Sequence, residues 1–304
     1  MRFLKALVVV ALGLLPVAAV RAQAQRESLV WAPVPTKPNA WVAPNKPHTK
    51  VADLLAAHKG QQAWRQPVVR DALLQADYVQ MAPGEKTPRQ FQPDNPIWWI
   101  GQDGEVRFTI KGQEPIVATK GFLVQVPYRN IYQLTATGTA PALFLEVKVA
   151  DSPTMYPEDE TPAPVPGMEF VKVRISGKAT YSDTVRPFFD FNAMVAGGRG
   201  GSRAFVSDAR AFANIIRGMP QADNPKDKGH FHEVSAEFWL VLEGTIEYKI
   251  GDLPIFNAVQ GDVVYVPKQT WHRAHHGGTG FSTRLAMNGY PQLLHNFQLN
   301  EDLR

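Results

Sequence analysis

The chain has 304 residues, no cysteine and a formal net charge of +4 at pH 7. The absence of cysteine excludes disulfides, thiol nucleophiles and a lipoprotein attachment site. Arg2, Lys5 and Arg21 supply three of the net positive charges, and no basic patch interleaved with aromatic residues follows them. Composition therefore argues against a nucleic-acid partner.

The first 24 residues have the pattern of a secretory signal peptide. Two basic residues precede an apolar stretch from Ala6 to Val20, and Ala22-Gln23-Ala24, with small residues at its first and third positions, forms a cleavage site. This stretch of 15 residues is too short for a membrane span, which needs roughly 20 residues. We therefore expect a mature chain that starts near Gln23 or Gln25, is periplasmic or secreted, and has no membrane partner after cleavage.

A proline-rich arm and one helix are expected over residues 25–65. Five prolines between residues 33 and 47 favour an extended conformation, because proline fixes φ and has no amide donor. Trp31 and Trp41 either pin this arm to the domain or pack locally. The apolar spacing from Val51 to His58 predicts a helix that ends at Gly60. After it, short β-branched and aromatic runs between Gly, Pro, Asn and Asp predict strands.

An internal repeat with an offset of 140 residues predicts the architecture. Residues 90–92 align with 230–232, residues 98–110 with 238–250, and residues 121–127 with 261–267. The repeat predicts an all-β chain of two barrels, at 66–150 and 186–291. A proline-rich linker at 151–185 joins them, and residues 292–304 form a tail.

The second copy of the repeat carries the residues for a metal site. His230 and His232 lie two positions apart, so their side chains point to the same side of a strand. A turn then returns the chain so that Glu237 can face the same interior, and His272 begins a later strand. Three imidazoles and one carboxylate suit a single divalent transition metal: Fe, Mn, Ni, Cu or Zn. Core histidines without a metal are the alternative interpretation.

The first copy lacks these ligands. Its residues at the four equivalent positions are Gln90, Gln92, Ile97 and Tyr132. Amides are poor ligands for metals that suit imidazole, and isoleucine is not a ligand. We therefore expect a metal-free first barrel that supports its twin, shapes the entrance to the second barrel, or binds a second small molecule.

The spacing of the ligands resembles that of the cupin superfamily. The first cupin motif, H-x-H-x4-E-x6-G, is matched without gaps by His230, His232, Glu237 and Gly244. The second motif is matched by Gly261, Pro267 and His272. Gln269 stands where this motif has a turn glycine and His276 where it has asparagine, which leaves the turn before His272 in question.

The resemblance implies a bicupin, two jelly-roll barrels of the double-stranded β-helix type with a degenerate first barrel. The chain is similar to the quercetinase-like metal-dependent cupins, in which the open metal positions take a substrate oxygen and either dioxygen or water. The resemblance also implies a homodimer, because cupins often pair through sheet edges.

The expected function is that of an exported metal-dependent enzyme. An oxygenase that acts on an aromatic, enol or diketone small molecule is preferred, with Glu237 as both ligand and general base. Trp239, Tyr265 and His276 are candidates for the substrate pocket, although Trp239 could simply fill the core. Either His275 or His276 is expected to orient a ligand imidazole. A redox-neutral isomerase, decarboxylase or lyase and a non-catalytic periplasmic binding protein are the alternatives.

Overall fold

The computed structural model describes residues 28–183, 185–222 and 224–303 of the chain. Residues 33–304 belong to one compact unit. The predicted signal peptide lies outside the described residues. Within the described ranges, no helix is both long enough and apolar enough to cross a membrane.

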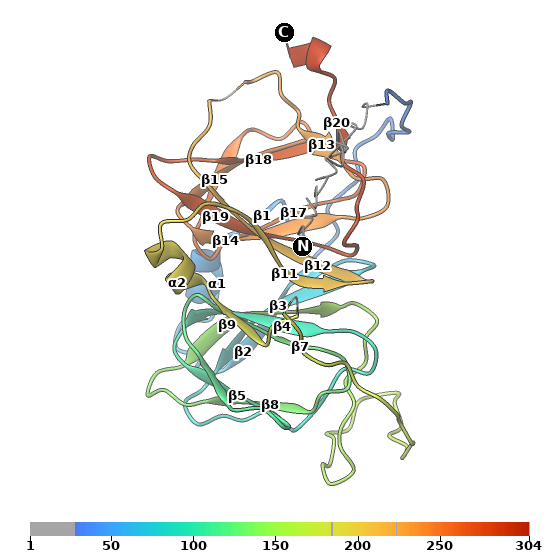
Figure 1. The fold of residues 1–304 in the computed structure, drawn as a ribbon, viewed down its shortest axis with the longest axis vertical. Coiled ribbons are helices and arrows are strands. Elements are labelled where there is room, and N and C mark those ends of the chain that lie inside the picture. Colours follow the sequence, from blue (N-terminus) through green and yellow to red (C-terminus); the bar gives the residue numbers. More distant parts are fainter. Residues whose placement is uncertain (1–27, 184, 223, 304) are drawn as a thin grey trace, which may run out of the picture. The chain divides into compact units, whose positions relative to one another are not determined.

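The chain is nearly all β and folds into two barrels, as the repeat predicts (Figure 1). The first barrel pairs a six-stranded sheet with a three-stranded sheet. The large sheet contains β2 (Trp64–Arg70), β3 (Leu74–Met81), β4 (Ile97–Asp103), β7 (Phe122–Val126), β9 (Ala142–Val149) and β10 (Phe188–Asp190). The small sheet contains β5 (Val106–Ile110), β6 (Ile116–Ala118) and β8 (Tyr132–Ala136).

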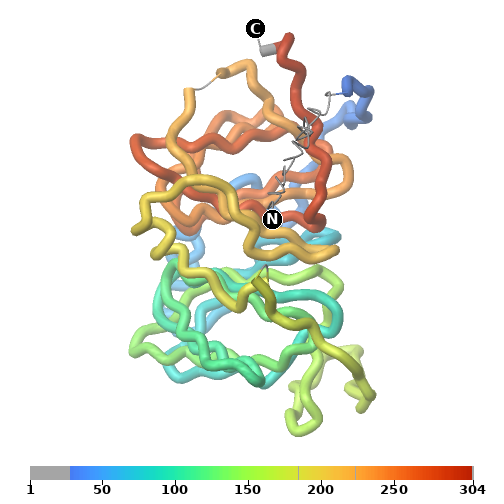
Figure 2. Tube along the Cα trace, viewed as in Figure 1, coloured from blue at the N-terminus to red at the C-terminus, as the bar shows by residue number. Residues whose placement is uncertain are grey.

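The second barrel repeats this plan with a six-stranded and a five-stranded sheet. Its large sheet contains β1 (His48–Thr49), β11 (Gly201–Asp208), β12 (Ala211–Gly218), β14 (Glu237–Glu243), β17 (Val263–Val266) and β19 (Ser282–Asn288). Its small sheet contains β13 (His230–Phe231), β15 (Thr245–Ile250), β16 (Phe256–Val259), β18 (His272–His276) and β20 (Asn296–Phe297). A short 3-10 helix, η1 (Asn300–Leu303), follows. Figure 2 traces the chain from the first barrel, in green, to the second, in orange and red.

The two barrels exchange one short strand each. β1, from the N-terminal arm, pairs with β17 of the second barrel, and β10 pairs with β7 of the first. The residue pairs His48↔Val264 and Phe188↔Val124 are related by the same offset of 140 residues as the rest of the repeat. The repeat therefore begins at His48, well before Gln90. The predicted boundary at residue 186 assigns β10 to the wrong barrel, because its backbone completes the sheet of the first one.

A helix follows each exchanged strand: α1 (Val51–Ala57) and α2 (Phe191–Ala196). The apolar spacing predicted α1, whereas α2 was not predicted. The Asp190 carboxylate caps α2 by accepting a hydrogen bond from the amide of Ala193, as is usual at a helix N-terminus. The six residues of α2 are too few to show a helical period.

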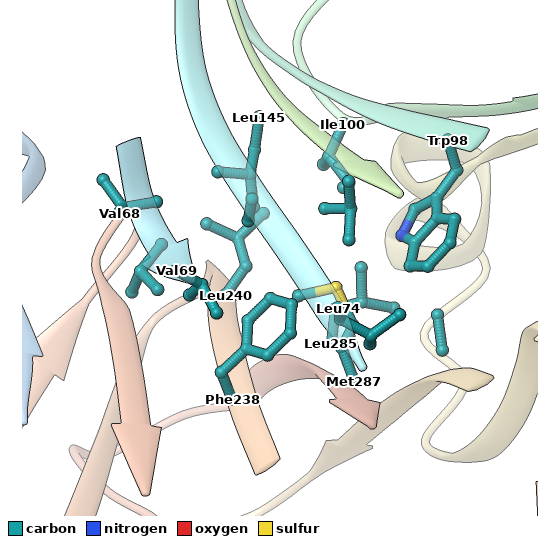
Figure 3. Close-up of a cluster of buried hydrophobic side chains, with 14 of the residues drawn as sticks. Val68, Val69, Leu74, Trp98, Ile100, Leu145, Phe238, Leu240, Leu285 and Met287 are labelled. Carbon is teal, nitrogen blue, oxygen red and sulfur yellow. The ribbon is translucent and has the colours of Figure 1, made fainter. Parts of the chain in front are cut away.

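The two large sheets pack against each other through a shared apolar core (Figure 3). Strand alternation divides β14 between two environments. Phe238, Leu240 and Leu242 lie in this shared core, whereas Trp239 and Val241 face the interior of their own barrel. Val68, Leu74 and Leu145 are among the first-barrel residues that meet them. Each barrel thus buries the outer face of the other.

Because the core is shared, we expect the two barrels to unfold together. Leu240 is fully buried. Its replacement by alanine should lower the free energy of unfolding by about 2–5 kcal/mol. Leu55→Ala on the exposed side of α1 is the control, with an expected effect of only a few tenths of a kcal/mol, about the difference in helix propensity. Urea unfolding followed by circular dichroism and tryptophan fluorescence should give one transition, shifted as a whole by Leu240→Ala. Two transitions, of which only one shifts, would show that the barrels are independent.

Candidate metal centre

Three elements bring the four predicted ligands to one point inside the second barrel. His230 on β13 stands directly opposite His272 on β18, His232 follows β13, and Glu237 is the first residue of β14. One potential ligand atom from each of the four residues lies within 4.8 Å of the others. His232, His272 and Glu237 are at most 6% exposed. In the part of the chain that the structure describes, this is the one such group of His, Cys, Asp or Glu side chains.

Backbone carbonyls fix the orientation of two of the rings. His232 Nδ1 lies 2.9 Å from the carbonyl oxygen of Leu294, and His272 Nδ1 lies 2.8 Å from that of Thr270. A carbonyl can only accept a hydrogen bond, so each Nδ1 carries a proton and, in the neutral ring, each Nε2 presents its lone pair. Both Nε2 atoms point at Glu237 Oε2, at 3.0 and 3.3 Å. Two lone pairs and a carboxylate oxygen therefore meet, and a cation between them would satisfy all three.

His230 completes this arrangement. Its Nε2 is buried and has no hydrogen-bond partner among the described residues. Burial, with a further contribution from the nearby His272, lowers the pKa of His230 to about 3, so the ring is neutral and can donate its lone pair. The four side chains thus fit a first-row divalent metal by donor type, protonation state and convergence.

The contact between His232 and Glu237 shifts the pKa of both groups. Burial opposes the charged forms of both His232 and Glu237, but their mutual contact outweighs it. The contact raises the pKa of His232 and, with a second hydrogen bond from His272, holds the pKa of Glu237 well below its ordinary value.

The turn before His272 keeps its geometry although glycine is missing. Gln269 adopts a left-handed conformation with φ of 58°, and its counterpart Arg129 in the first barrel has φ of 60°. The Gln269 amide donates to the carbonyl of His232 at 2.6 Å, and the Arg129 amide donates to that of Gln92 at 2.7 Å. The same hydrogen bond in both barrels holds a conformation that non-glycine residues seldom adopt.

The segment after β19 closes the barrel over the ligands and was missed from the sequence. Predicted as a tail, it supplies the Leu294 carbonyl and pairs with His230 through β20. The ring of His295 lies 4.6 Å from that of His232 and 4.7 Å from that of His230, between centroids. A cavity of about 500 Å³ lies beside it, lined by residues 233–234 and 290–294. His295 stands outside both motifs, so only its histidine identity could have drawn attention to it.

One of the three predicted pocket residues lies beside the ligands. The Trp239 ring is buried, and its centroid is 5.4 Å from that of His272. Below it, the Tyr248 hydroxyl and the Nε and Nη1 of Arg284 are buried without hydrogen-bond partners in the described part of the chain. Tyr248 faces the barrel interior, and Arg284 pairs with Val241, two positions along β19 from Ala286, the partner of Trp239.

Tyr265 and His276 lie elsewhere, contrary to the prediction. Tyr265 pairs with Phe238 and so faces the core between the barrels, where its hydroxyl bonds Asp71. His276 lies four residues beyond His272 on β18, about 13 Å along the strand. Its Nδ1 contacts the Ser282 hydroxyl at 2.9 Å.

The expectation that His275 or His276 orients a ligand ring is also wrong for His232 and His272. Backbone carbonyls occupy both of their Nδ1 atoms. His275 Nε2 instead lies 3.7 Å from an Asp227 carboxylate oxygen.

Comparisons with known proteins agree with this architecture. Residues 220–287, which hold all four ligands, match the cupin domain family. A salicylate 1,2-dioxygenase from Pseudaminobacter salicylatoxidans has a similar structure, with a TM-score of 0.60 and 12% identity over 86% of this chain and 88% of that one. A cupin 2 conserved barrel domain protein from Leptotrichia buccalis gives a TM-score of 0.54 and 11% identity over 80% of this chain and 95% of that one.

The same dioxygenase is also known in complex with gentisate, as a single-residue mutant with a TM-score of 0.58 and 12% identity over 80% of this chain and 81% of that one. No curated protein matches the sequence. At these identities the likeness shows the fold. The chain thus has the cupin fold, with a cupin domain in its second barrel.

We expect one metal ion per chain, bound in the second barrel. His232→Ala should lose the metal, whereas Gln92→Ala, the same change at the equivalent position of the first barrel, should keep it. A metal that binds only the folded chain adds about 3–4 kcal/mol at 100–1,000 times its dissociation constant, so the melting temperature of His232→Ala should fall while its strand spectrum persists. Elemental analysis with circular dichroism is the measurement. Two metals per chain, or a fully loaded His232→Ala, would contradict the assignment.

Proposed function

We propose that this cupin-fold protein is a metal-dependent oxygenase that acts on a small aromatic, enol or diketone substrate. The observation that carries the proposal is the convergence of three neutral imidazoles and the Glu237 carboxylate in a buried barrel. His230, His232, Glu237 and His272 would hold one ion of Fe, Mn, Ni, Cu or Zn. Such an ion would supply Lewis-acid and redox chemistry for a substrate that chelates it.

The side chains around the ligands have roles that follow from their positions. Glu237 is the sole carboxylate among the four ligands and so the one that can accept the proton of a substrate hydroxyl. Trp239 forms a flat, buried wall next to His272, which suits a planar substrate. His295 and the neighbouring cavity lie where a small molecule would enter. The covering segment 289–299 would limit access of water to the substrate.

The structural neighbours narrow the substrate class. They include a salicylate dioxygenase and its complex with gentisate, and salicylate and gentisate are both hydroxylated aromatic carboxylates. A hydroxyl beside a carboxylate offers two oxygens that would chelate a bound metal ion. Arg284 adds support, because its Nε and Nη1 donors inside the same barrel have no partner among the described residues and favour an anionic molecule. We therefore place hydroxylated aromatic acids first among the candidates.

Oxygen consumption tests the activity. Protein loaded anaerobically with each metal in turn should consume oxygen with at least one member of a panel of salicylate, gentisate, catechol, quercetin and acetylacetone. His232→Ala should reduce the rate to background because the ligand set is broken, and Gln92→Ala should leave it unchanged. Substrate conversion without oxygen uptake would favour the redox-neutral isomerase, decarboxylase or lyase. Tight binding without conversion would favour a binding protein.

We further propose that the protein acts outside the cytoplasm, in the periplasm or as a secreted protein. The basis is the short apolar stretch and small-residue cleavage site in residues 1–24. Expression in a bacterial host should yield a periplasmic or secreted product whose intact mass corresponds to a start near Gln23 or Gln25. A soluble cytoplasmic product that retains Met1 would contradict this proposal.

A further inference from the structure

The first barrel contains a cavity at the place that the metal centre occupies in the second. Its volume is about 500 Å³, and its lining includes Gln90, Gln92, Ile97 and Tyr132, the counterparts of the four metal ligands. Small-molecule sites in proteins have volumes of about 300–1,000 Å³. The first barrel has therefore lost the ligands of the metal but kept a space in which a small molecule fits.

In the first barrel, a lysine lies opposite the counterpart of Glu237. In the second barrel Glu237 pairs with Asn288, whereas in the first barrel Ile97 pairs with Lys148. The exchange replaces an acidic side chain and its neutral neighbour by an apolar side chain and a cationic neighbour. Lys148 lines the cavity, and its ammonium group makes one hydrogen bond to the described residues, a long one of 3.4 Å to the Ser152 carbonyl. Burial lowers its pKa, which shows that the ammonium is poorly solvated.

The carboxylates near Lys148 are already engaged by other groups. Glu146 accepts hydrogen bonds from the Trp99 indole at 2.8 Å and from Arg65 at 2.7 Å. Asp77 accepts from Arg65 at 2.8 Å and contacts Arg70. Arg65, Asp77 and Glu146 therefore form a closed network on one wall.

Glu85, which also lines the cavity, is bonded to the backbone amide of Ala82. None of these carboxylates makes a direct ion pair with Lys148 among the described residues. Among the charged groups at this cavity, the Lys148 ammonium is thus the cation that an incoming anion could neutralise.

Neutral donors and an apolar floor complete the cavity. Gln92 Nε2 makes only long contacts, 3.5 Å to the Tyr132 hydroxyl and 3.4 Å to that of Thr154. The Gln92 amide and the two hydroxyls can therefore donate to a bound acceptor instead. The apolar part of the lining includes Val79, Met81, Leu134 and Phe144. The cavity thus offers a cation, neutral donors and apolar surface to a bound molecule.

We propose that the first barrel binds a small organic carboxylate, with the carboxylate on the ammonium of Lys148 and the apolar body against the floor of the barrel. The site is separate from the metal centre and does not depend on the oxygenase activity. A carboxylate fits better than a cation, because Asp77 and Glu146 are ion-paired with arginines, whereas Lys148 has no ion pair among the described residues. It also fits better than a neutral molecule, which would leave the ammonium buried without a counter-ion.

Calorimetric titration of the full chain tests this proposal. The His232→Ala variant serves as the background, because it removes the metal centre as a competing carboxylate site. Benzoate is the probe and benzamide its uncharged analogue. Benzoate should bind saturably with one site per chain and at least about tenfold more tightly than benzamide, the effect of one charged hydrogen bond.

Variants at the cavity locate the site. Lys148→Met should weaken benzoate binding at least about tenfold, whereas Lys120→Met, at an exposed turn before β7, should not change it. Lys148→Arg, which keeps the charge, should retain more of the affinity than Lys148→Met. The melting temperature of Lys148→Met should not fall, because a poorly solvated charge is removed. If this variant unfolds, Lys148→Gln replaces it.

Three results would overturn the proposal: no saturable benzoate binding, equal affinity for benzoate and benzamide, or unchanged affinity in the folded Lys148 variants. Because the background lacks the metal centre, failure of the oxygenase assay leaves this outcome unaffected. Conversely, loss of benzoate binding in Lys148→Met says nothing against the metal centre.

Discussion

The metal centre depends on two hydrogen bonds from imidazole rings to backbone carbonyls. The carbonyls of Leu294 and Thr270 hold the Nδ1 protons of His232 and His272. If either ring were turned over, an N–H group would face Glu237 and the lone pair would be lost to the site. The orientation of the rings, and not only the presence of histidine, therefore suits this cluster to a cation. This also explains why the chain must return over the barrel after β19, since Leu294 lies in that returning segment.

The shared core explains how the second barrel tolerates such a polar interior. Two buried histidines, a half-buried third and a buried glutamate contribute little apolar area, and burying their polar atoms has a cost. The outer face of the large sheet, which carries Glu237, compensates by packing against the first barrel through Phe238 and Leu240. The exchange of β1 and β10 adds backbone pairing in both directions. The first barrel thus stabilises the second and can evolve a different cavity, because no metal ligand constrains its interior.

The sequence predicted the convergence of the four residues because strand geometry relates spacing directly to side-chain direction. His230 and His232 lie two apart, and the repeat set them against Gln90 and Gln92. The cupin fold and the two-barrel plan followed from the same evidence and are confirmed. Gln269 was an open question from the sequence, and the structure answers it by a backbone hydrogen bond to His232 that no residue pattern shows.

Other features could not be predicted because they depend on contacts between distant segments. Tyr265 was misplaced because its orientation depends on its pairing with Phe238, and a register error of one residue reverses the face. β1 and β10 are two and three residues long, too short for a pattern. Leu294 acts through its carbonyl, which every residue has, so the sequence carries no sign of its role. His295 is near the ligands only because β20 pairs with β13.

X-ray absorption spectroscopy of the metal-loaded chain tests the central claim most directly, because it counts imidazole ligands at the metal itself. The account predicts three imidazole nitrogens and at least one carboxylate oxygen, all about 2.0–2.2 Å from the metal. If the His272→Ala chain still binds metal, the spectrum should show one imidazole ligand fewer at that metal. A spectrum with fewer than three imidazoles in the unaltered chain, or one that His272→Ala leaves unchanged, would contradict the assignment of the site.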